Sequence, residues 1–149
     1  MGVGHVPAGK IRQEREGHDV PRREHRRARA YVGNLRLDVS KLASGQVGSL
    51  GEIIAARFLR DRGANIVDRN LVVGRGEIDM TVAFAGQKVA VEVKTGRADS
   101  VGEPVYRFNA AKLRQVRKLG FESGVTRVDY VGVELGAAGA VVRWLPNVG

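Results

Sequence analysis

The 149-residue sequence contains no cysteine and little histidine. Without cysteine no disulfide and no thiolate metal site can form, so nothing favours a secreted protein. The three histidines, His5, His18 and His25, all lie within the first 46 residues. This placement excludes histidine-ligated zinc and a histidine general base from residues 47–149. Any metal held in that region must be bound by oxygen atoms.

The sequence also lacks long apolar runs and contains few aromatic residues that could stack on nucleic-acid bases. No stretch approaches the roughly 20 apolar residues of a membrane-spanning helix, and residues 1–46 have no apolar segment like that of a signal peptide. We therefore expect a cytoplasmic protein that does not enter a membrane. Aromatic residues make up 5% of the chain, so Tyr130 and Trp144 are interpreted as core or rim residues rather than as base-stacking groups.

Positive charge is in excess, with 25 lysines and arginines against 16 aspartates and glutamates. Residues 1–46 hold 10 basic and 5 acidic residues, and residues 47–149 hold 15 and 11. A field of this sign favours polyanions such as nucleic acid. We predict a disordered basic tail over residues 1–46 and one α/β domain over residues 47–149. The tail either binds nucleic acid non-specifically, has no function of its own, or results from a start codon assigned too early.

The segment 76–94, GEIDMTVAFAGQKVAVEVK, has the pattern of a β-hairpin. Gly86-Gln87 has the composition of a two-residue type II′ turn. A turn there gathers the large apolar residues on one face by pairing Phe84 with Val89, Val82 with Val91 and Met80 with Val93. A slip of one residue would mix the two faces. The other face then holds Glu77, Asp79, Thr81, Glu92 and Lys94, with Asp79 opposite Lys94 and diagonal to Glu92.

Three of these charged residues suit phosphodiester hydrolysis. Carboxylates such as Asp79 and Glu92 are ligands for Mg²⁺ or Mn²⁺, and such a cation can neutralise a phosphate, activate water and stabilise the leaving oxygen. Lys94 lies on the same face as Glu92, because strand side chains alternate, and can orient the attacking water. The alternative is a solvated Asp79–Lys94 salt bridge worth about 0–1 kcal/mol.

Upstream, a helix is predicted over residues 48–63, ending at Gly63. Its apolar stripe comprises Leu50, Ile54, Ala55, Phe58 and Leu59. Glu52 lies at the margin of this stripe, where it can reach a site on the sheet. Ser49 and Glu52 also have the Ser-x-x-Glu spacing of a capping box, in which Glu52 would instead bond the first backbone amide of the helix. The sequence favours both roles about equally.

The remaining elements follow from the same patterns. Strands are expected over residues 64–73, 127–135 and 140–145, with a loop over 95–106 and a second helix over 107–119. This second helix carries several polar and basic side chains: Lys112, Arg114, Gln115, Arg117 and Lys118. They form either a surface for a phosphate backbone or an ordinary solvated helix face.

Together these motifs resemble the YraN family over about residues 47–149. The order Gly-Glu, Gly-Glu-Ile-Asp, Val-Glu-Val-Lys is specific, and the matching positions are Gly48, Gly51, Glu52, Ala55, Ala56, Leu59, Gly63, Asn70, 76–79, 91–95, Gly102, Pro104, Lys112 and 127–129. That family is similar to the PD-(D/E)xK nucleases, including archaeal Holliday junction resolvases. In this chain Gly96 separates Thr95 from Arg97, where YraN proteins usually have Lys-Thr-Arg.

The resemblance implies a restriction-endonuclease-like αβββαβ core, a mixed sheet flanked by helices. It implies a catalytic set of Glu52, Asp79, Glu92 and Lys94, with Asp79 and Glu92 as the ligands of Mg²⁺ or Mn²⁺. Nucleic acid, in the first place DNA, would be bound by Lys112, which the resemblance assigns to a motif position, together with Arg114 of the same basic helix face and Arg97, the basic residue that Gly96 displaces. The resemblance also suggests a homodimer with paired sites.

The sequence therefore predicts a Mg²⁺-dependent endonuclease acting on branched or otherwise structured DNA. One alternative is a non-catalytic nucleic-acid-binding module on a nuclease scaffold. Another is a basic protein that associates with ribosomal or other RNA.

Overall fold

The computed structural model describes residues 12–14, 26–31, 41–98, 109–136 and 139–148. These residues form two helices and seven strands in the order β1 (Arg12–Glu14), β2 (Arg26–Tyr31), α1 (Ser44–Arg60), β3 (Asn65–Val73), β4 (Gly76–Phe84), β5 (Gln87–Arg97), α2 (Ala110–Phe121), β6 (Arg127–Gly136) and β7 (Gly139–Leu145). The order α1-β3-β4-β5-α2-β6 is the expected αβββαβ core. Neither described helix is long and apolar enough to cross a membrane.

All strands belong to one mixed sheet with the order β1-β2-β7-β6-β5-β4-β3. Strands β5 and β6 are parallel, because α2 lies between them in the chain and returns it to the same edge. The other neighbouring strands are antiparallel. This arrangement confirms the predicted α/β class with a mixed sheet.

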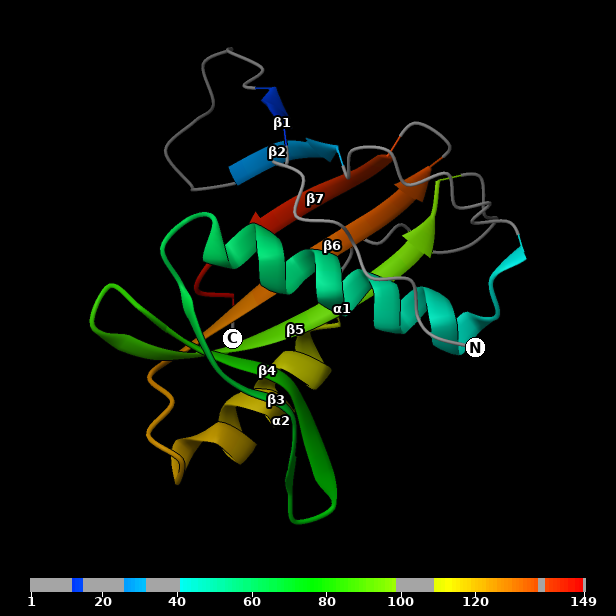
Figure 1. Cartoon of the computed structure of the whole chain (residues 1–149). Helices are drawn as coiled ribbons and strands as arrows, with labels where there is room; N and C mark the ends of the chain where they lie inside the picture. The colour runs from blue at the N-terminus through cyan, green and yellow to red at the C-terminus, as the bar shows by residue number, and fades with distance from the viewer. Residues whose placement is uncertain (1–11, 15–25, 32–40, 99–108, 137–138, 149) are drawn as a thin grey trace.

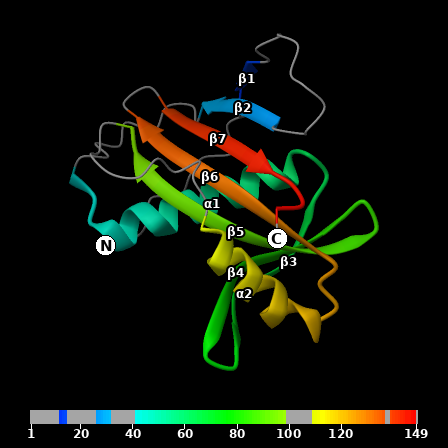
Figure 2. The ribbon, with the colours of Figure 1, turned by 180° about the vertical axis from the view of Figure 1, so that it is seen from behind.

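The two helices cover opposite faces of the sheet, as Figures 1 and 2 show from the two sides. Helix α1 packs Ile54, Phe58 and Leu59 against strand residues such as Met80 and Val91. On the other face, α2 packs Leu113 and Val116 with residues that include Ile78, Ala90, Val128 and Tyr130. Strands β5 and β6 thus bury both faces, which accounts for their nearly continuous apolar sequence.

Part of the expected basic tail belongs to the sheet. Strand β2 pairs antiparallel with β7, and β1 pairs with β2. This pairing supplies hydrogen-bond partners to β7, which would otherwise be an edge strand with unpaired backbone groups. The tail is therefore not uniformly unstructured. Its remaining portions, residues 1–11, 15–25 and 32–40, lie outside the described residues, as does most of the predicted loop over 95–106.

The turn between β4 and β5 differs from the predicted one. Phe84 pairs with Gln87, so the two-residue turn is Ala85-Gly86, not Gly86-Gln87. Both turn residues have positive φ, 48° for Ala85 and 76° for Gly86, which is the type I′ rather than the type II′ conformation. The predicted register is therefore wrong by two residues. Residues 95–97, predicted as loop, also belong to β5 and pair with β6.

Both helices are shifted relative to their predicted bounds, and α1 ends at Arg60 rather than at Gly63. Helix α1 begins at Ser44, four residues early, and the backbone amide of Ala43 donates to Gln46 Oε1 at 2.9 Å. Helix α2 begins at Ala110 because the Asn109 side chain caps it, accepting from the amides of Ala111 and Lys112. It ends at Phe121 rather than at residue 119.

Candidate active site

The site lies where β4 separates from β5. Residues Met80 to Phe84 of β4 pair with β5, whereas β4 begins at Gly76 and pairs with β3 down to that residue. The free end of the β3–β4 hairpin extends toward α2 (Figure 1), where Gly76 is in close contact with Leu119. Before Met80, β4 therefore pairs with β3 alone, and the sheet opens between β4 and β5 at this point.

Asp79 is the residue at this separation. Its neighbours Ile78 and Met80 belong to cores on opposite faces of the sheet, although strict alternation would place them on one face. Asn70, which lies between the partners of Ile78 and Met80 on β3, has a φ of 51°. The hairpin therefore twists strongly at Asp79, so this side chain is directed between β4 and β5.

A hydrogen bond fixes the Asp79 carboxylate. Its Oδ2 accepts from the backbone amide of Val93 at 2.9 Å. Continuing the observed register by one pair places Asp79 level with Glu92, not with Lys94 as predicted. The two carboxylates are therefore closer neighbours than the sequence indicated. The predicted face of five polar residues is also incomplete, because Thr81 is fully buried and donates to Asp68 at 3.3 Å.

Glu92 has the most perturbed environment of the four predicted catalytic residues. Burial, followed by the charge of Asp79, raises the pKa of Glu92 to about 7, while Lys112 opposes the shift. The Glu92 side chain is 15% exposed, and its Oε1 lies 3.7 Å from Lys112 Nζ. Its other oxygen, Oε2, is buried and has no hydrogen-bond partner. An acceptor of this kind carries a desolvation cost that a bound cation or donor would offset.

Glu52 approaches the site from α1. Burial raises the pKa of Glu52, the charges of Asp79 and Glu77 add to the shift, and Arg69 opposes it. The capping-box interpretation is wrong, because Ser49 lies inside α1 and donates to the carbonyl of Gly45 at 3.0 Å. Glu52 is thus free of a capping role and lies near Asp79. Arg69 of β3, which the sequence did not single out, is a cation of the same neighbourhood.

Two lysines flank the carboxylates. Lys94 follows Glu92 by two residues in β5, so both project from the face that α2 covers. Within the described ranges Lys94 makes no ion pair with Asp79, so the predicted alternative of an Asp79–Lys94 salt bridge is not observed. Lys112 of α2 instead pairs with Glu92, and it is 45% exposed. Lys112, predicted to bind nucleic acid, therefore reaches the site itself.

The other two predicted nucleic-acid contacts lie elsewhere. Arg97 donates a hydrogen bond to the carbonyl of Leu42, just before α1. It therefore lies on the α1 face of β5, opposite to Glu92 and Lys94. Arg114 is exposed on the outer side of α2. The structure thus brings together Glu52, Asp79, Glu92 and Lys112, keeps Lys94 on the same face of β5 as Glu92, and separates Arg97 and Arg114 from them.

The donor set fits a hard divalent cation in part. Asp79 and Glu92 offer carboxylate oxygens, and Mg²⁺ commonly uses one or two carboxylates and completes its shell with water and substrate phosphate. The unpartnered Glu92 Oε2 is the observation that favours such a ligand. No three acidic, histidine or cysteine side chains are grouped tightly enough to hold a metal alone, as far as the described residues extend.

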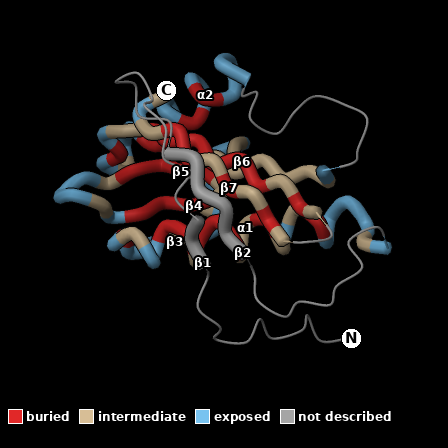
Figure 3. Tube along the Cα trace, turned by 90° about the horizontal axis from the view of Figure 1, so that it is seen from above, coloured by how far each residue is buried: buried red, intermediate tan, exposed pale blue. Residues whose placement is uncertain are grey.

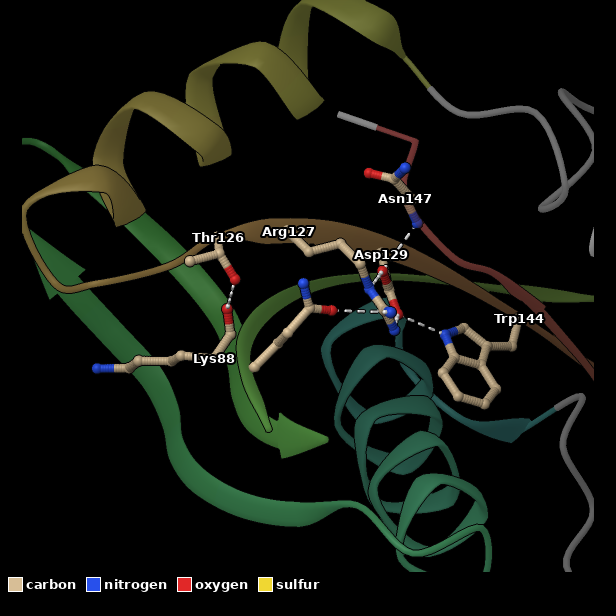
Figure 4. A network of polar contacts seen from close by, with 7 residues as sticks. Lys88, Thr126, Arg127, Asp129, Trp144 and Asn147 are labelled. Atoms are coloured by element: carbon tan, nitrogen blue, oxygen red, sulfur yellow. Dashed lines mark hydrogen bonds and ion pairs between the residues drawn. The ribbon is translucent and has the colours of Figure 1, made fainter. Parts of the chain in front are cut away.

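A second buried charge, Asp129, is structural. Figure 4 shows Arg127 and Trp144 directed at its carboxylate from β6 and β7, with the amide of Asn147 beyond them. Arg127 donates through Nε and Nη2 at 2.8 Å each, Trp144 Nε1 at 2.8 Å and the Asn147 amide at 2.9 Å. The carboxylate is therefore well satisfied, and it joins β6, β7 and the C-terminal segment.

Comparison with known proteins places the chain among uncharacterised relatives. The family described as "Uncharacterised protein family UPF0102" matches residues 51–133. A UPF0102 protein of Renibacterium salmoninarum is 42% identical over 97 residues, which cover 59% of this chain and 81% of that protein. One from Symbiobacterium thermophilum is 39% identical over 104 residues, covering 64% and 88%. UPF0102 is the YraN family, so the resemblance noted in the sequence is confirmed.

Among solved structures, the chain has a distant similarity to SfsA of Pyrococcus furiosus, determined in complex with Ca²⁺. The sequence identity is 14% and the TM-score is 0.31. The match covers 64% of this chain and 59% of that one, which is less than two thirds of its length.

Proposed function

This chain belongs to UPF0102, an uncharacterised protein family, and we propose that it is a Mg²⁺-dependent endonuclease with a site formed by Glu52, Asp79, Glu92 and Lys94. The observation that carries the proposal is the pair of carboxylates at the separation of β4 and β5. Asp79 is oriented by the Val93 amide, and Glu92 retains one buried oxygen without a partner. Two partly buried carboxylates side by side repel each other when both are charged, and a bound cation would offset this repulsion.

Each residue has a role that follows from its position. Asp79 and Glu92 would hold the cation, which when bound neutralises phosphate charge and lowers the pKa of water. Lys94, on the same face as Glu92, orients the attacking water. Lys112 offsets charge on the phosphate, since its ammonium already lies beside Glu92. Glu52, whose pKa is raised by burial, accepts a proton from water or serves as an outer ligand.

The substrate proposed is branched or otherwise structured DNA, on the family similarity and the basic charge of the chain. The proposed location is the cytoplasm, and the proposed assembly is a homodimer, both for the reasons given by the sequence.

Cleavage of labelled DNA by the purified chain tests this function. Four-way junctions, flaps, single strands and linear duplexes are incubated with Mg²⁺, with Mn²⁺ and with EDTA. We expect cleavage of a branched substrate with either metal, and a loss of about 100-fold or more with Asp79→Asn or Glu92→Gln. Glu122→Gln, which changes an exposed carboxylate at the end of α2, is the control and retains full activity.

Metal binding provides a second measurement that does not depend on turnover. Isothermal titration of the parent with Mg²⁺ is expected to show a site that Asp79→Asn and Glu92→Gln weaken and that Glu122→Gln leaves unchanged. Absence of cleavage on every substrate, or equal cleavage by Glu92→Gln and the parent, would contradict the enzyme proposal.

A non-catalytic nucleic-acid-binding module is the second candidate function. It is favoured by one observation, the lack of a group of three acidic or metal-binding side chains in the described part of the chain. In that case the chain binds DNA without cutting it, and binding is insensitive to Mg²⁺. An RNA competitor included in the same assay separates a DNA-binding protein from one that prefers RNA.

A further inference from the structure

The outer face of α2 carries an exposed aromatic ring among cations. Phe121, the last residue of α2, is 78% exposed, more than any other large apolar side chain that the structure describes as exposed. Phenylalanine is usually buried, because its ring contributes a large apolar area. At this exposure the ring buries little of its apolar area against the fold, so it is accessible to an external partner.

Arg114, Lys118 and Phe121 form one stripe along the helix. They are spaced by four and three residues, which places them on one face of an α-helix. The opposite face holds Leu113, Val116 and Gly120 in the core, and Figure 3 shows α2 changing between buried and exposed colours along its length. Helix α2, AAKLRQVRKLGF, contains no acidic residue. The stripe therefore presents two cations and a ring to the outside without a negative charge in its own helix.

This composition fits a nucleic acid with unpaired bases. Lysine and arginine contact the phosphates, and an exposed ring stacks on a base, which is the recurring arrangement in single-strand binding. A paired duplex offers no free base face to Phe121. A membrane surface fits less well, because the other large apolar residues of α2 are turned into the core and one ring gives little apolar area.

We propose that the stripe of Arg114, Lys118 and Phe121 is a binding surface for single-stranded nucleic acid, with Phe121 stacking on a base. The partner class rests on the proposed function. Lys112, nine residues before Phe121 in the same helix, pairs with Glu92 of the site, so the stripe ends about 14 Å along the helix axis from that lysine. Nine residues make about two and a half helical turns, so Phe121 projects from the side of α2 opposite Lys112, and the stripe is a surface separate from the site.

A tryptophan placed at the stripe reports directly on stacking. The chain has one natural tryptophan, Trp144, which is 2% exposed and bonded to Asp129. In EDTA, addition of a thymidine oligonucleotide is expected to quench the fluorescence of the Phe121→Trp variant but not that of the parent. The parent thus serves as the control for the buried tryptophan.

Affinity measurements identify the ring as the cause. Phe121→Ala and Phe121→Leu are each expected to bind the oligonucleotide about tenfold more weakly than the parent, whereas Val72→Ala, at another exposed apolar position, binds as the parent does. Arg114→Ala and Lys118→Ala should each reduce the slope of log K against log salt by roughly 0.7.

Several outcomes would overturn the proposal. These are an unquenched Phe121→Trp variant, an unchanged affinity of Phe121→Ala or Phe121→Leu, equal competition by polyglutamate, and tighter binding to phosphatidylserine vesicles through Phe121. The measurements are made without metal, so they are independent of cleavage. Glu92→Gln is expected to bind the oligonucleotide normally even where it fails to cut, which distinguishes failure of this surface from failure of the active site.

Discussion

The Asp79 carboxylate receives the backbone amide of Val93 at 2.9 Å, across the point where β4 and β5 separate. In a continued β4–β5 pairing the Val93 amide would donate to a backbone carbonyl of β4, and here the Asp79 side chain takes the place of that carbonyl. The bond fixes Asp79 beside Glu92, the residue that precedes Val93. Separation of the strands and convergence of the two carboxylates are therefore one structural feature, since a fully paired hairpin would leave no room for Asp79 between its strands.

The raised pKa of Glu92 predicts a dependence of stability on pH. Because the folded chain holds this proton up to about pH 7, against an ordinary value of 4.5, the contribution is fully present below pH 4.5 and is lost as pH rises through 7. In EDTA we expect the free energy of unfolding to fall by about 1–3 kcal/mol between pH 5 and pH 8 through this group.

Urea denaturation at the two pH values, on the parent and on Glu92→Gln, measures the effect. The variant should lose most of the dependence and be the more stable protein at pH 8, and Glu122→Gln should behave as the parent. An equal dependence in parent and Glu92→Gln would show that Glu92 is not the titrating group. Added Mg²⁺ should stabilise the parent more at pH 8 than at pH 5, since the deprotonated carboxylate is the ligand.

Substitution of Lys112 is predicted to change the affinities for metal and for nucleic acid in opposite directions. The Lys112–Glu92 ion pair is half-exposed at 3.7 Å, so Lys112→Met should change stability by less than about 1 kcal/mol. Removal of a cation beside the carboxylates should tighten Mg²⁺ binding a few-fold, because like charges repel. Binding of DNA in EDTA should weaken, because one phosphate contact is lost. If Lys112→Met weakens both metal and DNA, its role is structural instead; Lys118→Met is the matched control for the metal titration.

The sequence predicted the order of elements from α1 to β7 and the apolar face of the β4–β5 hairpin, because alternation and apolar stripes report burial directly. It did not predict the register of the β4–β5 hairpin. A shift of two residues leaves every side chain on its own face, so the apolar pattern excludes odd slips but not even ones. The error placed Asp79 opposite Lys94, and therefore the predicted salt bridge had the wrong partners.

Other site features depended on contacts between distant segments. The pairing of Lys112 with Glu92 joins α2 to β5, and the proximity of Arg69 to Glu52 joins β3 to α1. Neither has a local sequence signal. Phe121 was missed for a local reason, because the helix was predicted to end at residue 119, which left the ring in a loop. Its position after Gly120, a weak helix former, accounts for that boundary.

Addition of a side chain at Gly51 is predicted to disrupt the packing of α1 against β5. A Cβ atom at this residue would lie 1.7 Å from Thr95 Oγ1 and 2.6 Å from Thr95 Cβ, so α1 and β5 are in contact without room for a methyl group. Gly51→Ala should destabilise the fold by about 1–3 kcal/mol or more. Gly48→Ala, where nothing lies within 4 Å, should stabilise it by roughly 0.5–1 kcal/mol through helix propensity. Urea denaturation of both variants checks the contrast, and a similar sign for both would contradict the close contact.

Substitution of Asp129 is predicted to lower the stability of the fold while leaving the candidate active site in place. Asp129→Ala leaves the buried donors of Arg127 and Trp144 without an acceptor, which typically costs about 3–5 kcal/mol. Asp61→Ala, at an exposed position after α1, should stay within about 0.5 kcal/mol of the parent. Should Asp129→Ala fail to fold, Trp144→Phe removes a single 2.8 Å bond to the same carboxylate and is expected to cost about 1–3 kcal/mol. A Trp144→Phe protein as stable as the parent would count against the network.

The hairpin turn gives the sharpest test of the register. Ala85 has a φ of 48°, which an alanine adopts at a cost and an asparagine tolerates. Ala85→Asn creates the Asn-Gly pair preferred in type I′ turns and should raise the free energy of unfolding by roughly 0.5–1 kcal/mol. Gln87→Asn, which would favour a type II′ turn at Gly86-Gln87, should instead destabilise the fold slightly, because Gln87 Oε1 accepts from Arg127 at 3.3 Å. Thermal or urea denaturation of the two variants decides between the turns. A gain from Gln87→Asn without one from Ala85→Asn would favour the register predicted from the sequence, in which Asp79 lies opposite Lys94.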